Sequence, residues 1–142
     1  MNIIIDAMGG DNAPDVTVWG AAMAAKEYGE DILLVGQPEA ITSVLRAHGM
    51  ENTGHLTIMA GMTVADASGT SEMCDAPTAA IRGKKDSSMV VGLRMLAAGE
   101  GDAFVSAGST GALLAGATLI VKRLRGVKRP AIGTVIPGAK QP

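Results

Sequence analysis

Three short segments combine glycines with charged or hydroxyl side chains that could hold an anion or orient a proton donor. They are Asp6–Asp11, Arg82–Ser88 and Ser106–Ala112. Each one lies at the end of an expected strand or at the start of an expected helix. Open α/β sheets bind their ligands at such places. The three segments are therefore the candidate binding residues of this chain.

The segment Ser106–Ala112 has the composition of an anion-binding turn. Its small residues leave backbone N–H groups exposed at the start of a helix, and Ser109 and Thr110 add hydroxyl donors. Unsatisfied donors and the positive end of the helix dipole together attract an anion. The same glycines and alanines would equally allow the helix to pack closely on a sheet, so both interpretations stay open.

The segment Arg82–Ser88 places three cations just before a helix start that a serine can cap. An anion bound there gains ~0.3–1 kcal/mol from the dipole at an exposed position. An ordinary charged loop with an N-cap explains the pattern as well. In Asp6–Asp11, the paired glycines Gly9 and Gly10 would let a ligand approach the backbone. Its two carboxylates could bind a metal or orient a donor, or Asp11 could simply cap the next helix.

Apolar runs alternate with amphipathic stretches, which predicts βαβ units, a mainly parallel sheet and an α/β fold with three αβα layers. Strands are expected at 2–6, 32–36, 55–60, 102–106 and 131–136. Helices are expected at 14–28, 38–48 and 77–82, from a cap at 86 or 87 to Gly99, and at 109–124, with a long loop at 61–77. Asp11 or Asn12 is expected to cap the first helix. Its inward face is expected to carry Val16, Gly20 and Met23, and helix 109–124 is expected to be buried almost all round.

The composition fits one globular domain in the cytoplasm, with no metal and no cofactor. The chain has 142 residues, of which 47% are hydrophobic and only 2% aromatic, too few for the stacking platforms of single-stranded nucleic-acid binders. The single cysteine excludes an internal disulfide and a cysteine-rich metal site. The longest uncharged apolar run, 111–121, is shorter than the ~20 residues that a bilayer requires. The last expected strand has no helix after it, which indicates either an edge strand or a shortened chain.

The charges are separated along the chain. Residues 1–81 hold eleven acidic and two basic side chains, whereas residues 82–142 hold three acidic and ten basic ones. Five cations lie within eight residues: Lys122, Arg123, Arg125, Lys128 and Arg129. They are either a solvated helix end, where cations suit the dipole, or an electropositive surface for an anionic partner.

Four ordered motifs resemble the bacterial phosphate acyltransferase family. They are the opening Asp6–Asp11 with Pro14, the run from Pro77 through Arg82, Lys84 and Lys85 to Ser88, the turn Ser106–Ala112, and Arg129–Ile132. The family most often has asparagine where this chain has Ser109, so a contact there is expected to be rearranged. Family members are more than twice as long, so this chain would be a single α/β domain that forms their N-terminal half.

The resemblance implies a reversible reaction in which acyl-[acyl-carrier protein] and inorganic phosphate give acyl phosphate and free carrier protein. It also implies a role in phospholipid synthesis, a fold like that of isocitrate and isopropylmalate dehydrogenases, a homodimer, and peripheral association with a membrane acyltransferase at the inner face of the membrane. No nucleic-acid partner is implied. A phosphotransacetylase-like enzyme that uses acyl-coenzyme A, or a fragment that binds phosphate or carrier protein without turnover, would fit the same residues.

Because phosphate is itself the nucleophile, this reaction needs no catalytic serine or cysteine. On this basis Lys84, Arg82 and Ser87 are the expected catalytic residues. The phosphate-binding residues would be Gly9, Gly10, Asp11, Lys85, Ser88, Ser106, Gly108, Ser109, Thr110 and Gly111. The five cations of residues 122–129 would dock the acidic carrier protein.

Overall fold

A parallel sheet of four strands forms the centre of the computed structural model, which describes residues 1–50, 54–60 and 86–133. The strands are β1 (Asn2–Asp6), β2 (Asp31–Gly36), β3 (Leu56–Ala60) and β4 (Ala103–Val105), in the spatial order β3-β2-β1-β4. All three pairings are parallel, with Ile4 opposite Leu33 on one side and Phe104 on the other. The predicted α/β class, the parallel sheet and the first four strands are confirmed.

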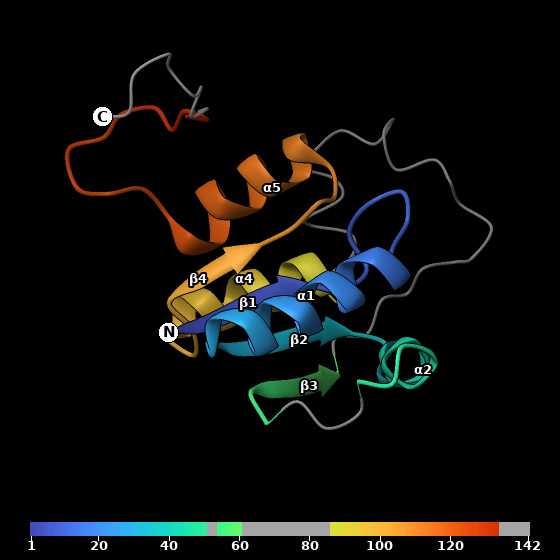
Figure 1. Cartoon of the computed structure of the whole chain (residues 1–142). Helices are drawn as coiled ribbons and strands as arrows, with labels where there is room; N and C mark the ends of the chain where they lie inside the picture. Colours follow the sequence, from blue (N-terminus) through green and yellow to red (C-terminus); the bar gives the residue numbers. More distant parts are fainter. Residues whose placement is uncertain (51–53, 61–85, 134–142) are drawn as a thin grey trace, which may run out of the picture.

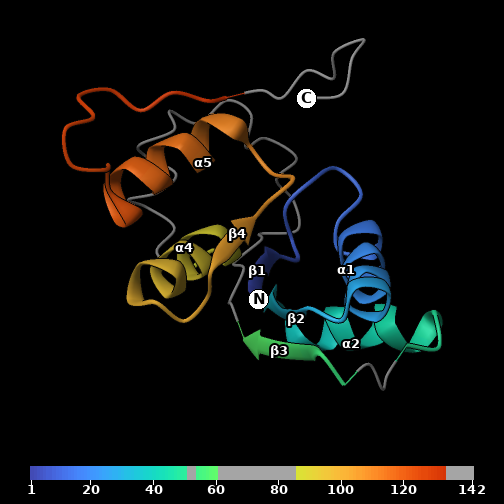
Figure 2. The same cartoon turned by 60° about the vertical axis from the view of Figure 1, so that its left-hand side comes forward.

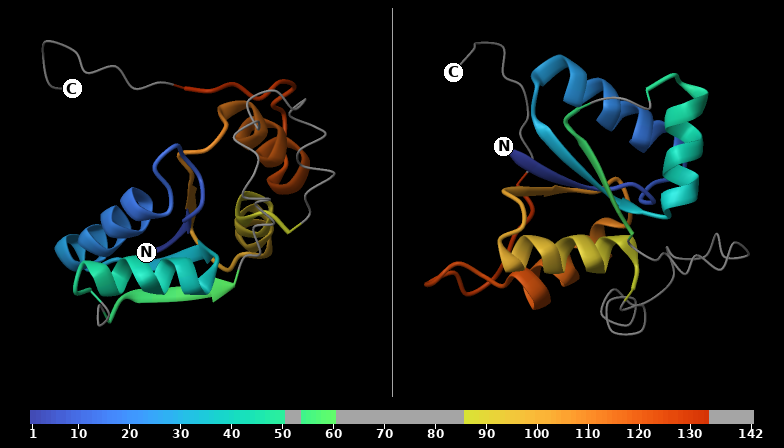
Figure 3. Two further views of the ribbon diagram at one scale, coloured as in Figure 1. Left: turned by 90° about the vertical axis from the view of Figure 1, so that its right-hand side faces the viewer. Right: turned by 90° about the horizontal axis from the view of Figure 1, so that it is seen from below.

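Helices cover both faces of this sheet (Figure 1). The helices α1 (Asp15–Tyr28) and α2 (Pro38–Ala47) lie on one face, and α4 (Ser88–Ala98) lies on the other (Figure 2). Two further views show the same three layers (Figure 3). The expected αβα layering therefore holds in the described part of the chain.

The face of α1 that packs on the sheet is rich in alanine. Its buried residues are Val18, Ala21, Ala22 and Ala25, whose spacing follows the helical period. The predicted inward face of Val16, Gly20 and Met23 is wrong, because Val16 is 55% and Met23 44% exposed. Both sides of this helix carry apolar residues, and the sheet takes the side with small side chains that let the backbones approach closely.

The start of α1 also differs from the prediction. Asp11 and Asn12 do not cap it with their side chains: the N-cap position is Pro14, and it makes no side-chain capping bond. Instead the backbone carbonyl of Asn12 accepts from the amide of Val16 at 3.2 Å. The hydroxyl of Thr17 donates to the carbonyl of Ala7 at 2.6 Å, which fastens this helix to the end of β1.

The opposite helix, α4, follows its sequence signals closely. Ser87 is the N-cap and its hydroxyl oxygen accepts from the amide of Val90 at 3.3 Å, while Gly99 ends the helix with φ 80°. A Cβ added to Gly92 would lie 2.3 Å from the ring of Phe104. Glycine at this position therefore allows α4 to pack directly on β4.

The last helix is shorter and more open than expected. It runs as α5 (Thr110–Gly116) and continues as a π-helix, η1 (Ala117–Val121), in which Lys122 ends the element with φ 76°. Gly116 is the only buried residue of α5 and η1. Leu119 and Val121 are exposed, as is Leu124, which follows η1. The prediction that 109–124 is a helix buried all round is therefore wrong. Residues 131–133 do not form the expected strand, and 134–136 lie outside the described residues, as do the expected helix 77–82 and loop 61–77.

Candidate functional site

The strand order reverses direction at β1. The chain runs from β1 outward to β2 and β3, and then returns to place β4 on the other side of β1. In open α/β sheets, ligands bind outside the carboxyl ends of the strands at such a switch point. The two segments that follow β1 and β4 are Asp6–Asp11 and Ser106–Ala112, so the topology places both candidate segments at one location.

A buried carboxylate links these segments. Asp6 is only 2% exposed. Its Oδ1 accepts from the Ser88 hydroxyl at 2.5 Å and from the Met8 amide at 3.2 Å. Its Oδ2 accepts from the Ser106 hydroxyl at 2.8 Å. Three donors on one carboxylate provide the compensation that burial of this group demands. The first turn of α4 is thereby joined to the ends of β1 and β4.

The backbones of Gly9 and Gly108 lie close to the side chains of this network. A Cβ on Gly9 would lie 2.5 Å from Oδ2 of Asp6 and 2.8 Å from the Ser106 oxygen. A Cβ on Gly108 would lie 3.2 Å from that same oxygen and 3.6 Å from the Gly9 backbone. Gly10 has φ 115°, a conformation that favours glycine. These glycines thus hold the two turns in contact.

The turn after β4 keeps donors available. The Gly108 amide donates to the Ser106 oxygen at 3.1 Å, and the Ala112 amide donates to the Ser109 side chain at 3.4 Å. Thr110 and Gly111 occupy the first turn of α5, where an intrahelical acceptor does not exist. Their amides have no acceptor among the residues that the structure describes. Ser109 and Thr110 are exposed, so this turn is accessible and not enclosed by the protein.

The structure brings together five of the predicted site residues, namely Gly9, Gly10, Ser88, Ser106 and Gly108. Thr110 and Gly111 follow in the first turn of α5. Ser109 serves as the N-cap of α5, and Ser87 as the N-cap of α4. Asp11 is exposed, and its side chain takes no part in the described hydrogen bonds around Asp6. Arg82, Lys84 and Lys85 lie outside the described residues. Within the described ranges no cluster of His, Cys, Asp and Glu side chains could hold a metal.

Comparisons with known proteins identify the family of this chain. A family model described as "Fatty acid synthesis protein" matches residues 1–142. This chain belongs to that family.

Curated members of the family carry the name phosphate acyltransferase. The protein of Herpetosiphon aurantiacus is 44% identical over 137 residues, which cover 96% of this chain and 35% of the relative. That of Thermotoga neapolitana is 44% identical over 140 residues, 99% of this chain and 38% of the relative. That of Clostridioides difficile is 40% identical over 141 residues, 99% of this chain and 39% of the relative. The chain therefore spans well under half the length of these family members.

A second feature of this family member is the basic segment, residues 122–129, which carries the five clustered cations. All five are exposed. The guanidinium of Arg123 donates to the carbonyl of Lys128, and the Val127 amide donates to the Leu124 carbonyl at 3.1 Å, so the segment turns back on itself.

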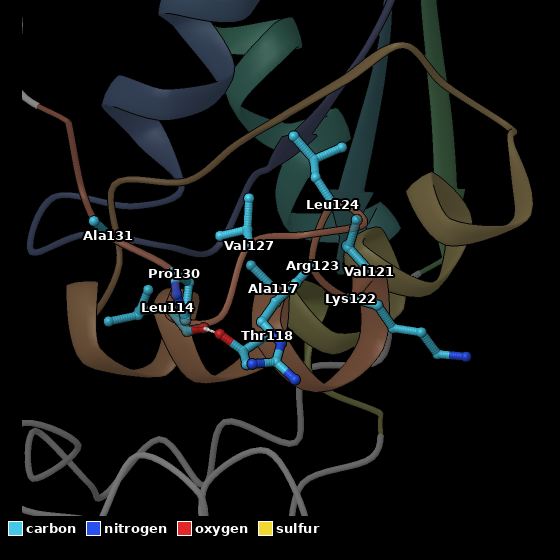
Figure 4. A pocket seen from close by; sticks show the side chains of 10 residues that line it. All are labelled: Leu114, Ala117, Thr118, Val121, Lys122, Arg123, Leu124, Val127, Pro130 and Ala131. Atoms are coloured by element: carbon cyan, nitrogen blue, oxygen red, sulfur yellow. Dashed lines mark hydrogen bonds between the residues drawn. The ribbon is translucent and has the colours of Figure 1, made fainter.

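An apolar hollow of about 310 Å³ lies between this segment and the last helix. Figure 4 shows that α5 and η1 supply Leu114, Ala117, Thr118 and Val121, and that the returning chain supplies Leu124, Val127, Pro130 and Ala131. Lys122 and Arg123 also line the hollow, and the Lys122 side chain points away from the other labelled groups. Leu124 is 82% exposed. An apolar hollow edged by cations is suited to an acidic, amphipathic partner.

Asp6 is not among the binding residues that the sequence predicts. The sequence indicates Asp6 and Asp11 as a possible pair of metal ligands or donor-orienting groups, and the structure supports the orienting role for Asp6 alone. The available signal was an acidic residue at the last position of a buried strand, three residues before a pair of glycines.

In the part of the chain that the structure covers, no helix is long and apolar enough to cross a membrane.

Proposed function

We propose that this chain provides the phosphate-binding part of an acyltransferase that moves a fatty acyl group between acyl-carrier protein and inorganic phosphate. The observation that carries the proposal is the accessible turn at the switch point. There the amides of Thr110 and Gly111 are free of acceptors within the described residues, next to hydroxyls that Asp6 holds in place. The family description and the names of the relatives supply the reaction class.

This reaction asks little of the protein beyond positioning and charge stabilisation. Phosphate attacks the thioester carbon, the tetrahedral oxyanion collapses, and the carbon–sulfur bond breaks to release the carrier thiol. Holding the two reactants together can contribute ~7–11 kcal/mol, and each donor to the oxyanion ~2.7–4 kcal/mol. Gly10, Thr110 and Gly111 would supply the main-chain donors, because the amides of Gly9 and Gly108 already donate to Asp6 and Ser106.

Neutralising the phosphate charge falls to Lys84, Lys85 or Arg82. These cations precede the cap residue Ser87 in the sequence. In a full-length enzyme of this family, replacing the residues equivalent to Lys84 and Ser87 by alanine is expected to abolish acyl phosphate formation. The single Ser87→Ala variant, which also removes the cap of α4, shows how much of the loss is due to this serine.

The basic segment would dock the carrier protein. Five exposed cations attract an acidic surface, and the hollow beside Leu124 and Val127 would take an apolar side chain of the partner. The dehydrogenase-like fold, the homodimer and the association with a membrane acyltransferase belong to the same proposal, because they follow from the family resemblance alone.

The test is an assay for phosphate-dependent release of free thiol from acyl-[acyl-carrier protein], with the Thermotoga neapolitana relative as the positive control. Turnover with the carrier-protein donor supports the proposal, whereas turnover with acyl-coenzyme A alone favours a phosphotransacetylase-like enzyme. Phosphate binding without turnover limits this chain to the binding part of the reaction. A chain that shows no turnover and binds no phosphate would contradict the proposal.

A further inference from the structure

The hydrogen bonds of Asp6 fix which way two hydroxyl groups face. A serine hydroxyl has one hydrogen to donate and two lone pairs that can accept. Ser88 and Ser106 both direct that single hydrogen to the carboxylate, at 2.5 Å and 2.8 Å. While these bonds persist, neither hydroxyl can donate to a bound anion. Each can only accept.

Ser106 is the serine with access to the turn. Ser88 is 3% exposed, whereas Ser106 is half-buried in the segment that also holds Ala107 and Ser109, both exposed. The Ser106 oxygen accepts the Gly108 amide at 3.1 Å, which occupies one of its two lone pairs. No other donor among the described residues bonds this oxygen, which leaves one acceptor position beside the proposed anion site.

We propose that Asp6, acting through Ser106, makes this site select an oxyanion that carries a proton, namely hydrogen phosphate, and reject sulfate. The inference rests on the proposed function, since it concerns the same phosphate site. A P–O–H group can donate to the free lone pair of Ser106. Sulfate is fully ionised at neutral pH and has no hydrogen to offer, so it would set its own lone pairs against that of Ser106. Asp6 is the positioning residue, because it touches the serine and not the anion.

Rotation of the Ser106 hydroxyl to donate to the anion instead would be unfavourable. Rotation would remove a donor from a carboxylate that is 2% exposed. Buried acceptors that lose a donor bear the full cost of desolvation. The backbone of Gly9 also lies so close that even a Cβ there would be 2.5 Å from Oδ2, which limits how far the carboxylate can turn.

The experiment measures the affinities of the 142-residue chain for inorganic phosphate, arsenate and sulfate at pH 7 by calorimetry or amide chemical shifts. Arsenate has the tetrahedral shape of phosphate and carries a proton at this pH. Phosphate and arsenate should bind about tenfold or more tightly than sulfate, since a site built to bond a hydroxyl rejects an analogue that lacks one. Equal affinities for phosphate and sulfate would overturn the inference.

Two variants separate positioning from a structural role. In Asp6→Asn the amide nitrogen can donate to a serine and release its hydroxyl to face the anion as a donor. The ratio of phosphate to sulfate affinity should then fall toward one. Ser106→Ala removes the acceptor and should lower the ratio, while the Asp6 carboxylate keeps its bonds from Ser88 and Met8. This second variant keeps the test informative if Asp6→Asn folds poorly. Asp31→Asn, at the amino end of β2, should leave the ratio unchanged.

If Asp6 had a purely structural role, its replacement would lower the affinities for phosphate and for sulfate by the same factor. An unchanged ratio of the two affinities in both variants would overturn the inference. Binding of neither phosphate nor sulfate by the unsubstituted chain would contradict the proposed function itself. The two failures therefore give different results.

Discussion

Oδ2 of Asp6 lies 2.8 Å from the hydroxyl oxygen of Ser106, although one hundred positions separate the two residues in the sequence. This bond connects the carboxyl end of β1 to that of β4. Together with the bond from Ser88, it draws three separate segments onto one carboxylate. The candidate site therefore depends on long-range contacts that form only in the complete sheet.

Replacing Asp6 by alanine should destabilise the protein by about 3 kcal/mol, because one buried hydroxyl, one half-buried hydroxyl and an amide lose their acceptor. Urea denaturation followed by circular dichroism measures this change. Glu27→Ala, on an exposed side chain of α1, should stay within about 0.5 kcal/mol of the parent. A loss below about 1 kcal/mol for Asp6→Ala would mean that the network contributes little.

Gly9→Ala should cost about 1–3 kcal/mol and weaken phosphate binding, since its Cβ would lie 2.5 Å from Asp6 and 2.8 Å from Ser106. Gly20→Ala is the matched control. It lies within α1 with open space around the added methyl group, so it should stabilise the helix by about 0.5–1 kcal/mol. Unfolding curves and phosphate titrations of both variants test the pair, and equal effects in the two would refute the close-approach argument.

Ser87→Ala should lower stability by about 1 kcal/mol, because the Val90 amide loses its capping acceptor. Ser87→Asn keeps a good cap and should remain close to the parent. Hydrogen exchange at the first turn of α4 distinguishes the two variants. Similar exchange rates in both would show that the cap contributes no stability to this helix.

Reversing two charges in the basic segment, Lys128→Glu with Arg129→Glu, should weaken binding of acyl-carrier protein by tenfold or more at low ionic strength, an estimate of about 0.7 kcal/mol per charge. The difference should shrink as salt is added, because exposed charges are screened within about 10 Å at 0.1 M. Surface plasmon resonance at two salt concentrations provides the measurement. The double variant Lys26→Glu with Arg46→Glu, on the opposite face of the sheet, should bind the carrier protein as the parent does.

Local sequence signals predicted the strands and α4 well. β1, for example, has the predicted bounds, and α4 has the predicted serine cap and glycine end. These features follow from backbone preferences within a few residues. The inward face of α1 could not be derived in this way, because Val16 and Met23 are as apolar as the residues that the sheet selects. Only the packing of the alanine side against β2 and α2 decides between them.

The candidate site was partly predictable for the same reason. Glycines and serines after strands mark the turns, and the return of β4 to the side of β1 brings those turns together. The role of Asp6 depends on partners 82 and 100 positions away, which no local pattern indicates. The buried character expected for helix 109–124 was also inferred from composition alone, and exposed Leu119 and Val121 contradict it.

The most direct test of the central claim is an amide chemical-shift titration of the chain with inorganic phosphate. The account predicts saturable shifts confined to Gly9, Gly10 and the turn from Ala107 to Gly111, with little change in α2 or β3. Shifts centred on the basic segment, or no saturable shift in the turns after β1 and β4, would contradict it.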